Sequence, residues 1–226
     1  TEVPNSLIVS STNKLYILGT TGSSNYPTTA GSFDQTFNGG TNFTLTYVLQ
    51  YTQGSDIVIS RLSNDGTSLL SSTYVGGSGN DGLNTPWPLK HNYADEVRGE
   101  IMIDKNDNIY VVSSTHSHDF PVTTGVLQPN FGGGLQDGCI FKMDYTLSNM
   151  IWASYLGGSN NDAIYSIVLD NNNTLFVAGG TSSHDFPTTP GTLHPSYIGG
   201  SADGFVSRIN NNGTQILFST YYGSTH

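Results

Sequence analysis

Cysteine and charged residues are scarce in this 226-residue sequence. Its single cysteine, Cys139, excludes an intrachain disulfide, and its place in an apolar segment predicts a buried packing role. Only 11% of the residues are charged, and 17 acidic residues outnumber 7 basic ones, which gives a net charge of −10. Because such a surface repels phosphate groups, we expect no nucleic-acid partner.

Long apolar runs and ligand-binding motifs are also missing. No stretch reaches the roughly 20 apolar residues of a membrane-spanning helix, so we expect no membrane span. The sequence has no phosphate-binding loop, dinucleotide fingerprint or nucleophile elbow. His116 and His118 have no cysteine or third histidine at zinc spacing, and the "DKNDN" segment at 104–108 is better explained as a hairpin turn than as a calcium loop. The sequence therefore predicts no cofactor and no metal.

A long internal repeat dominates what the sequence does contain. The segment "HDFPTTPG" at 184–191 has an earlier copy, "HDFPVTTG", at 118–125, and a looser copy, "SNYPTTAG", at 24–31. The proline of this motif recurs after 94 and then 66 residues, so the first unit is 28 residues longer than the others. The extra residues fall into insertion one, 41–53, and insertion two, 82–96. Repeats on this scale decide the architecture of a chain.

Each unit is expected to form four short antiparallel strands. In the third unit they fall at 166–170, 174–181, 204–209 and 215–222, rich in β-branched and aromatic residues and separated by Asn- and Gly-rich turns. The first-unit equivalents are expected near 6–10, 14–20, 56–62 and 68–75. Four-stranded units stacked around an axis predict an all-β chain with a β-propeller fold. The visible blades are a first unit at about 5–81, a second at 97–162 and a third at 163–226.

Three blades are fewer than a closed ring normally contains, which is about four to eight. We therefore expect the chain to be part of a longer protein whose remaining blades lie in the same parent chain. The alternative is that another chain completes the ring.

The unit resembles the bacterial β-propeller repeat called the SBBP repeat. The motifs that carry the resemblance in the third unit are Asp170, Phe186-Pro187-Thr188-Thr189, Gly199-Gly200, Asp203, Arg208 and Ser219-Thr220-Tyr221. They cover nearly the whole chain apart from the two insertions. The resemblance implies a propeller on a large secreted or surface protein of bacteria, often one exported by type IX secretion, with no reaction and no catalytic residues.

The His-Asp pair of the repeated motif suggests chemistry, but comparison of the copies favours a structural role. His118 and His184 align with Ser24, whereas an Asp or Asn followed by an aromatic residue and Pro persists in all three units. We expect the Asx residue to shape a turn and the aromatic residue to anchor the long loop. The expected anchors are Tyr26, Phe120 and Phe186, then Phe33, Leu127 and Leu193, and then Phe37, Phe131 and Tyr197. Arg61, Lys142 and Arg208 also recur, which predicts a repeated ion pair without naming the partners.

The two insertions are where a function specific to this chain is expected. Insertion one alternates apolar and polar residues and predicts a half-buried strand or hairpin. Insertion two holds a tryptophan between two prolines, and aromatic rings beside polar groups suit a protein partner or a glycan. The predicted binding residues are Tyr47, Tyr51, Trp87, His91 and Tyr93. The competing interpretation is that both insertions only pack on each other.

Three functions remain open at this stage. The leading one is a non-catalytic interaction or adhesion module, secreted or on a bacterial cell surface. The second is a structural component of a secretion or gliding-motility assembly. The third is a polysaccharide hydrolase or lyase using His91, Asp95 or Glu96, which is less favoured because adjacent strand residues point to opposite faces.

Overall fold

The chain forms three four-stranded antiparallel sheets of the same design. The computed structural model describes residues 1–45, 49–90 and 95–225. No α-helix occurs in those ranges, and η1 (Trp87–Leu89) is a single 3-10 turn. The expectation of an all-β chain is confirmed, and the expected strand positions agree with the observed ones to within a few residues. The strands are β1 (Glu2–Val9), β2 (Leu15–Thr21), β5 (Asp56–Leu62) and β6 (Leu69–Val75); β7 (Glu100–Ile103), β8 (Ile109–Thr115), β9 (Asp137–Met143) and β10 (Met150–Leu156); β11 (Asp162–Leu169), β12 (Leu175–Thr181), β13 (Asp203–Ile209) and β14 (Ile216–Tyr222).

Strand order and register repeat from unit to unit. In every sheet neighbouring strands follow one another along the chain, as in β1-β2-β5-β6. Thr21 lies opposite Asp56, Thr115 opposite Asp137 and Thr181 opposite Asp203. The turn after each first strand repeats a left-handed residue, at Asn13 (φ 56°), Asp107 (φ 61°) and Asn173 (φ 58°). Asn and Asp tolerate this conformation better than other side chains, which confirms that 104–108 is a hairpin turn.

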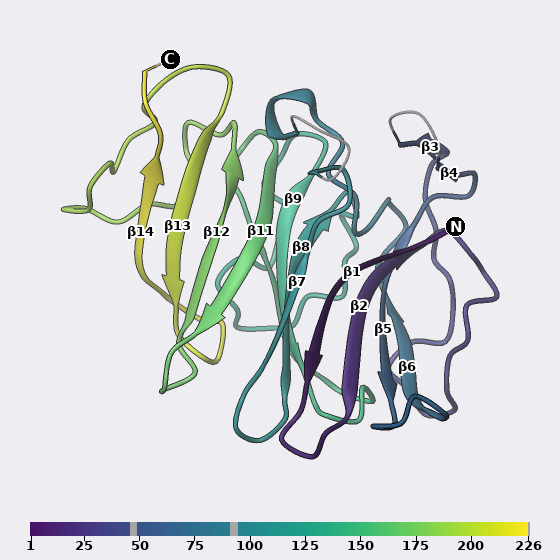
Figure 1. Cartoon of the computed structure of the whole chain (residues 1–226). Coiled ribbons are helices and arrows are strands. Elements are labelled where there is room, and N and C mark those ends of the chain that lie inside the picture. The colour runs from purple at the N-terminus through teal and green to yellow at the C-terminus, as the bar shows by residue number, and fades with distance from the viewer. Residues whose placement is uncertain (46–48, 91–94, 226) are drawn as a thin grey trace.

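The three sheets stand side by side and pack face to face (Figure 1). One apolar core lies between the first and second sheets and includes Leu18, Ile59 and Phe141. A second lies between the second and third sheets and includes Val112, Ile140 and Phe205. Cys139 is buried in the first of these cores, as its strand position indicated. Among the described residues, no helix is long and apolar enough to cross a bilayer.

The recurring basic residue forms the expected ion pair in two of the three units. Lys142 Nζ lies 3.3 Å from Asp104 Oδ2, and Arg208 Nη2 lies 3.2 Å from Asp170 Oδ2. In the first unit Ser10 stands where the aspartates stand in the other units, and Arg61 instead faces the ring of Tyr145 from the second unit, 5.4 Å from its centroid. This contact places a cation of one unit against a turn of the next.

Candidate functional site

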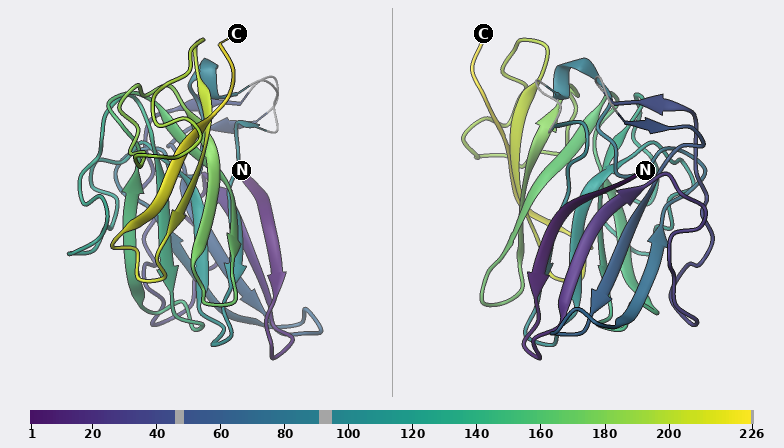
Figure 2. Two further views of the ribbon diagram at one scale, coloured as in Figure 1. Left: turned by 90° about the vertical axis from the view of Figure 1, so that its left-hand side faces the viewer. Right: turned by 45° about the vertical axis from the view of Figure 1, so that its right-hand side comes forward.

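Insertion one folds as a hairpin beside the first sheet. Its strands β3 (Phe43–Thr44) and β4 (Gln50–Tyr51) pair with Phe43 opposite Tyr51, and the hairpin lies above the sheet (Figure 2). Leu45 and Tyr51 pack with Leu83 of insertion two in a small core separate from the two large ones. The two insertions therefore pack on each other at these residues, and that they do nothing else stays a prediction.

Insertion two is held by a network centred on Asn84. The Asn84 side-chain amide donates to the carbonyl oxygens of Leu89 (2.8 Å) and Asp95 (3.0 Å), which holds these two residues beside Asn84. Gln136 of the second unit donates to Asn84 Oδ1 (2.8 Å) and accepts from the backbone N–H of Thr85 (3.0 Å). Because Asn84 and Gln136 are both buried, these bonds form away from water and fix the loop on the second unit.

The loop also reaches the third unit. Tyr165 Oη donates to the carbonyl oxygen of Leu89 (2.7 Å), and the Arg98 guanidinium stacks on the Tyr165 ring, 4.6 Å from its centroid. Gly180 permits this approach, because a Cβ there would lie 2.7 Å from Tyr165 Oη. Tyr165 replaces Gly99 of the second unit, so the contact is specific to the third unit. Insertion two thus bridges parts of all three units.

The predicted binding residues have different fates. Trp87 is 76% exposed on η1, where Pro86 and Pro88 restrict the backbone. Tyr51 is 0% exposed, so its assignment to a binding surface is wrong. Its side chain instead packs in the small core with Leu45 and Leu83. Tyr47, His91 and Tyr93 lie outside the described residues.

The two carboxylates of the enzyme hypothesis each have a cation beside them. The buried Glu96 carboxylate lies with Oε1 2.5 Å from Nζ of the partly exposed Lys90, and Asp95 Oδ1 lies 3.1 Å from Arg98 Nη1. Lys90 also lies over the ring of Phe43, 5.7 Å from its centroid, and so ties the two insertions together. Within residues 1–45, 49–90 and 95–225, no group of three or more His, Cys, Asp or Glu side chains is arranged to hold a metal.

The Asp of the His-Asp motif joins one unit to the next. Asp119 Oδ1 accepts from the backbone N–H (2.8 Å) and hydroxyl (3.1 Å) of Ser78, and Asp185 Oδ1 accepts from the same groups of Ser159 (2.8 and 2.9 Å). We call these contacts the latch. The expectation that the Asx residue mainly shapes its own turn was too narrow, because its carboxylate binds the preceding unit. The glycine before each serine is required, since a Cβ on Gly158 would lie 2.6 Å from Asp185 Oδ1.

The rest of the motif anchors the loop. Phe120 and Phe186 are buried, and Phe186 packs against Phe205 with ring centroids 4.2 Å apart. His184 stacks on Tyr197 and His118 on Phe131, with centroids 4.1 and 4.2 Å apart. The expectation that Leu193 anchors its loop is wrong, because this side chain is exposed. Its equivalents in the first and second units, Phe33 and Leu127, are partly buried against the apolar cores.

Four buried aspartates near the latch sit in unusual electrostatic surroundings. Burial raises the pKa of Asp56 to about 7, of Asp81 and Asp137 to about 8, and of Asp162 to about 6. They lie in pairs across a glycine: a Cβ on Gly157 would meet Asp137 and Asp162. The charge of Asp162 raises the pKa of Asp137 further. Hydrogen bonds lower both pKa values and so offset part of the effect of burial: Gly132 donates to Asp137, and Gly158 and Ser183 donate to Asp162.

A cavity of about 390 Å³ opens between insertion two and the third unit. Pro88 and Leu89 line it from insertion two, Arg98 and Tyr165 also line it, and residues 200–204 line it from the third unit. Trp87 directly precedes the lining residue Pro88 in the sequence.

Comparison with known proteins supplies no relative to guide the assignment. No model of a known protein family matches the chain, and no curated protein matches it either.

Proposed function

We propose that the three sheets are consecutive blades of a β-propeller. The proposal is supported by the face-to-face packing of the sheets and by the contacts of β7 with both β1 and β11, which bring the first strands of the units together (Figure 1). The Glu100 carboxylate of β7 accepts bonds from the Ser166 hydroxyl and the Ile167 N–H of β11, both at 2.7 Å. Adjacent first strands are what a ring of radial blades requires.

We further propose that the chain is a non-catalytic adhesion module, secreted or on a bacterial cell surface, that binds its ligand through insertion two. The single observation that carries the proposal is Trp87: a large aromatic side chain that is exposed, flanked by prolines and specific to one unit. Holding such a ring rigid lowers the entropy lost on binding. The resemblance to a repeat of bacterial surface proteins supports the location.

A neutral glycan is the favoured ligand class. The exposed Trp87 ring lies on the same short turn as Lys90, whose ammonium group pairs with Glu96. An isolated ring with polar neighbours suits the apolar face and hydroxyl groups of a sugar. The net charge of −10 disfavours acidic glycans.

Replacing Trp87 with alanine is expected to weaken glycan binding by about tenfold or more, because the ring supplies the main contact. Binding of the full chain to a glycan array identifies the ligand, and titration calorimetry with that glycan measures the loss. Leu193→Ala, an exposed apolar residue in a third-unit loop, is the matched control and should bind as the wild type does. Equal affinities for wild type and Trp87→Ala would refute the assignment of binding to insertion two.

A further inference from the structure

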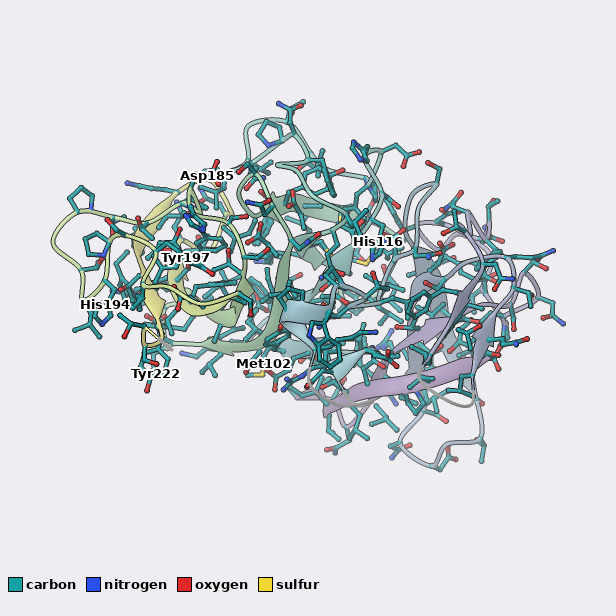
Figure 3. All side chains as sticks on the ribbon, turned by 90° about the horizontal axis from the view of Figure 1, so that it is seen from above. Met102, His116, Asp185, His194, Tyr197 and Tyr222 are labelled. Atoms are coloured by element: carbon teal, nitrogen blue, oxygen red, sulfur yellow. The ribbon has the colours of Figure 1, made fainter. Side chains whose placement is uncertain are left out.

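Insertion two contacts the repeated units at positions where the three units differ in sequence. Three side chains of the second and third units that bond to it are His116, Gln136 and Tyr165. Their equivalents in the other units have smaller side chains or none: Gly22 and Ser182 for His116, Ser55 and Ala202 for Gln136, and Asn5 and Gly99 for Tyr165. Seen from above, His116 lies near the middle of the molecule, whereas His194 of the third unit lies at one end (Figure 3). Replacements that occur in one unit only therefore gather around the insertion.

Gln136 keeps the bond that the repeat makes at its position and adds two more. In the first unit the hydroxyl of the equivalent Ser55 donates to the carbonyl oxygen of Asp81 (2.9 Å). The Gln136 amide donates to the equivalent carbonyl oxygen, that of Asp162 (3.2 Å). Its longer side chain also makes its two bonds to insertion two. The added bonds therefore serve the insertion, because the repeat itself is satisfied by a serine.

The turn that carries Trp87 is bonded at both of its ends, each time to a different unit. Before the turn, the backbone N–H of Thr85 donates to the Gln136 side chain of the second unit (3.0 Å). At the end of the turn, the Leu89 carbonyl oxygen accepts from Tyr165 Oη of the third unit (2.7 Å). A turn held in this way is fixed against both sheets.

A second replacement in the third unit accompanies Tyr165. A Cβ on Gly180 would lie 2.7 Å from Tyr165 Oη and 3.2 Å from Cδ2 of Leu89. The equivalents of Gly180 are Thr20 and Ser114, whose side chains would enter this space. The glycine and the tyrosine thus act together on one contact with insertion two.

We propose that Gln136 and Tyr165 are positioning residues for the binding turn: they bond its two ends to the second and third units, so that the Trp87 ring is presented in one place. The inference rests on the proposed function of insertion two. Order that is present before the glycan binds does not have to be acquired on binding, so the affinity is higher. The repeated units then contribute to binding through the turn, without touching the glycan.

Gln136→Ser and Tyr165→Phe remove these bonds with little other change. A serine at position 136 can still make the bond that Ser55 makes in the first unit, and a phenylalanine at position 165 keeps the aromatic ring. Tyr26→Phe is the matched control, because it removes one Oη hydrogen bond of the first unit, to Ser60 at 2.8 Å. Urea denaturation establishes that the single variants and the double variant still unfold cooperatively.

Backbone NMR relaxation of the isotope-labelled chain measures whether the turn is held. We expect N–H order parameters of about 0.85 for Trp87 and Leu89 in the wild type, falling toward about 0.6 in the double variant. Gln136→Ser and Tyr165→Phe should each raise the dissociation constant of the glycan identified on the array about three- to tenfold. Tyr26→Phe should change neither quantity. Lower stability with unchanged order parameters and affinity is the result of a purely structural role, and it would overturn the inference.

The same experiment separates this inference from the proposed function. An unchanged affinity in the double variant, while Trp87→Ala still loses binding, would overturn the inference and leave the proposed function standing. Binding that survives Trp87→Ala would overturn the proposed function. In that case the order parameters of the free chain would still decide whether Gln136 and Tyr165 hold the turn.

Discussion

Replacing Phe186 with alanine is expected to lower the free energy of unfolding by about 3 kcal/mol. The Phe186 ring is buried and packs on Phe205. Its backbone N–H donates to Tyr221 Oη at 3.0 Å, and alanine keeps this bond, so the expected loss comes from the ring alone. Truncation leaves a cavity in the core between the second and third sheets, since the surrounding strands are fixed by their ladders. Urea denaturation followed by circular dichroism measures the change.

His184→Ser supplies the control within the same motif. The histidine ring is exposed and stacks on Tyr197, and the first unit already has Ser24 at this position. We expect a loss below about 1 kcal/mol, the scale of one exposed ring contact. Similar losses from the two variants would contradict the structural explanation of the motif.

Raising the pH from about 4 to about 8 is expected to destabilise the fold by several kcal/mol. The pKa of each of Asp56, Asp81, Asp137 and Asp162 is higher in the folded chain than the ordinary 3.8 of an aspartate. Between the unfolded and folded pKa values the folded state therefore holds more protons, and stability falls as the pH rises.

Asp137→Asn isolates one of these groups. An uncharged amide resembles the protonated acid, so the variant should be more stable than the wild type at pH 8 and should show a shallower decline between about pH 4 and 8. Asp65→Asn is the control, because hydrogen bonds lower the pKa of that exposed carboxyl to about 2 and its titration lies below this window. Chemical denaturation at each pH gives the comparison, and parallel curves for wild type and Asp137→Asn would refute the electrostatic argument.

The strands could be predicted from the sequence because their signals are local. Alternating β-branched and aromatic residues between Asn- and Gly-rich turns specify strands. Because the unit occurs three times, each strand could be assigned independently in three aligned segments. The left-handed turn residues Asn13, Asp107 and Asn173 follow from the same comparison. How the sheets are placed relative to one another depends on distant contacts, which the repeat alone does not encode.

The site was harder to predict because its contacts join segments far apart in the sequence. Tyr51 was assigned to a surface by alternation, although only the packing against Leu83 decides which side of the hairpin is buried. The bond from Tyr165 to Leu89 spans 76 residues, and nothing local marks it. The latch did have a signal in the sequence: "GGSGND" and "GGSNND" precede the two "HDFP" segments at spacings that become equal once insertion two is left out. The pairing of Ser78 with Asp119 could have been sought there.

The central claim is that insertion two, and not the repeated units, carries the binding function. Deleting 82–96 tests it most directly, because the chain itself shows the resulting junction: Asp81 would join Val97 as Asp162 joins Ala163 between the second and third units. Exchanging 191–194 for the equivalent second-unit residues 125–128 is the control on the repeated surface. Both variants should still unfold cooperatively, which shows that they are folded. The deletion should then abolish binding of the glycan identified on the array, whereas the exchange should preserve it. Binding that survives the deletion would contradict the account.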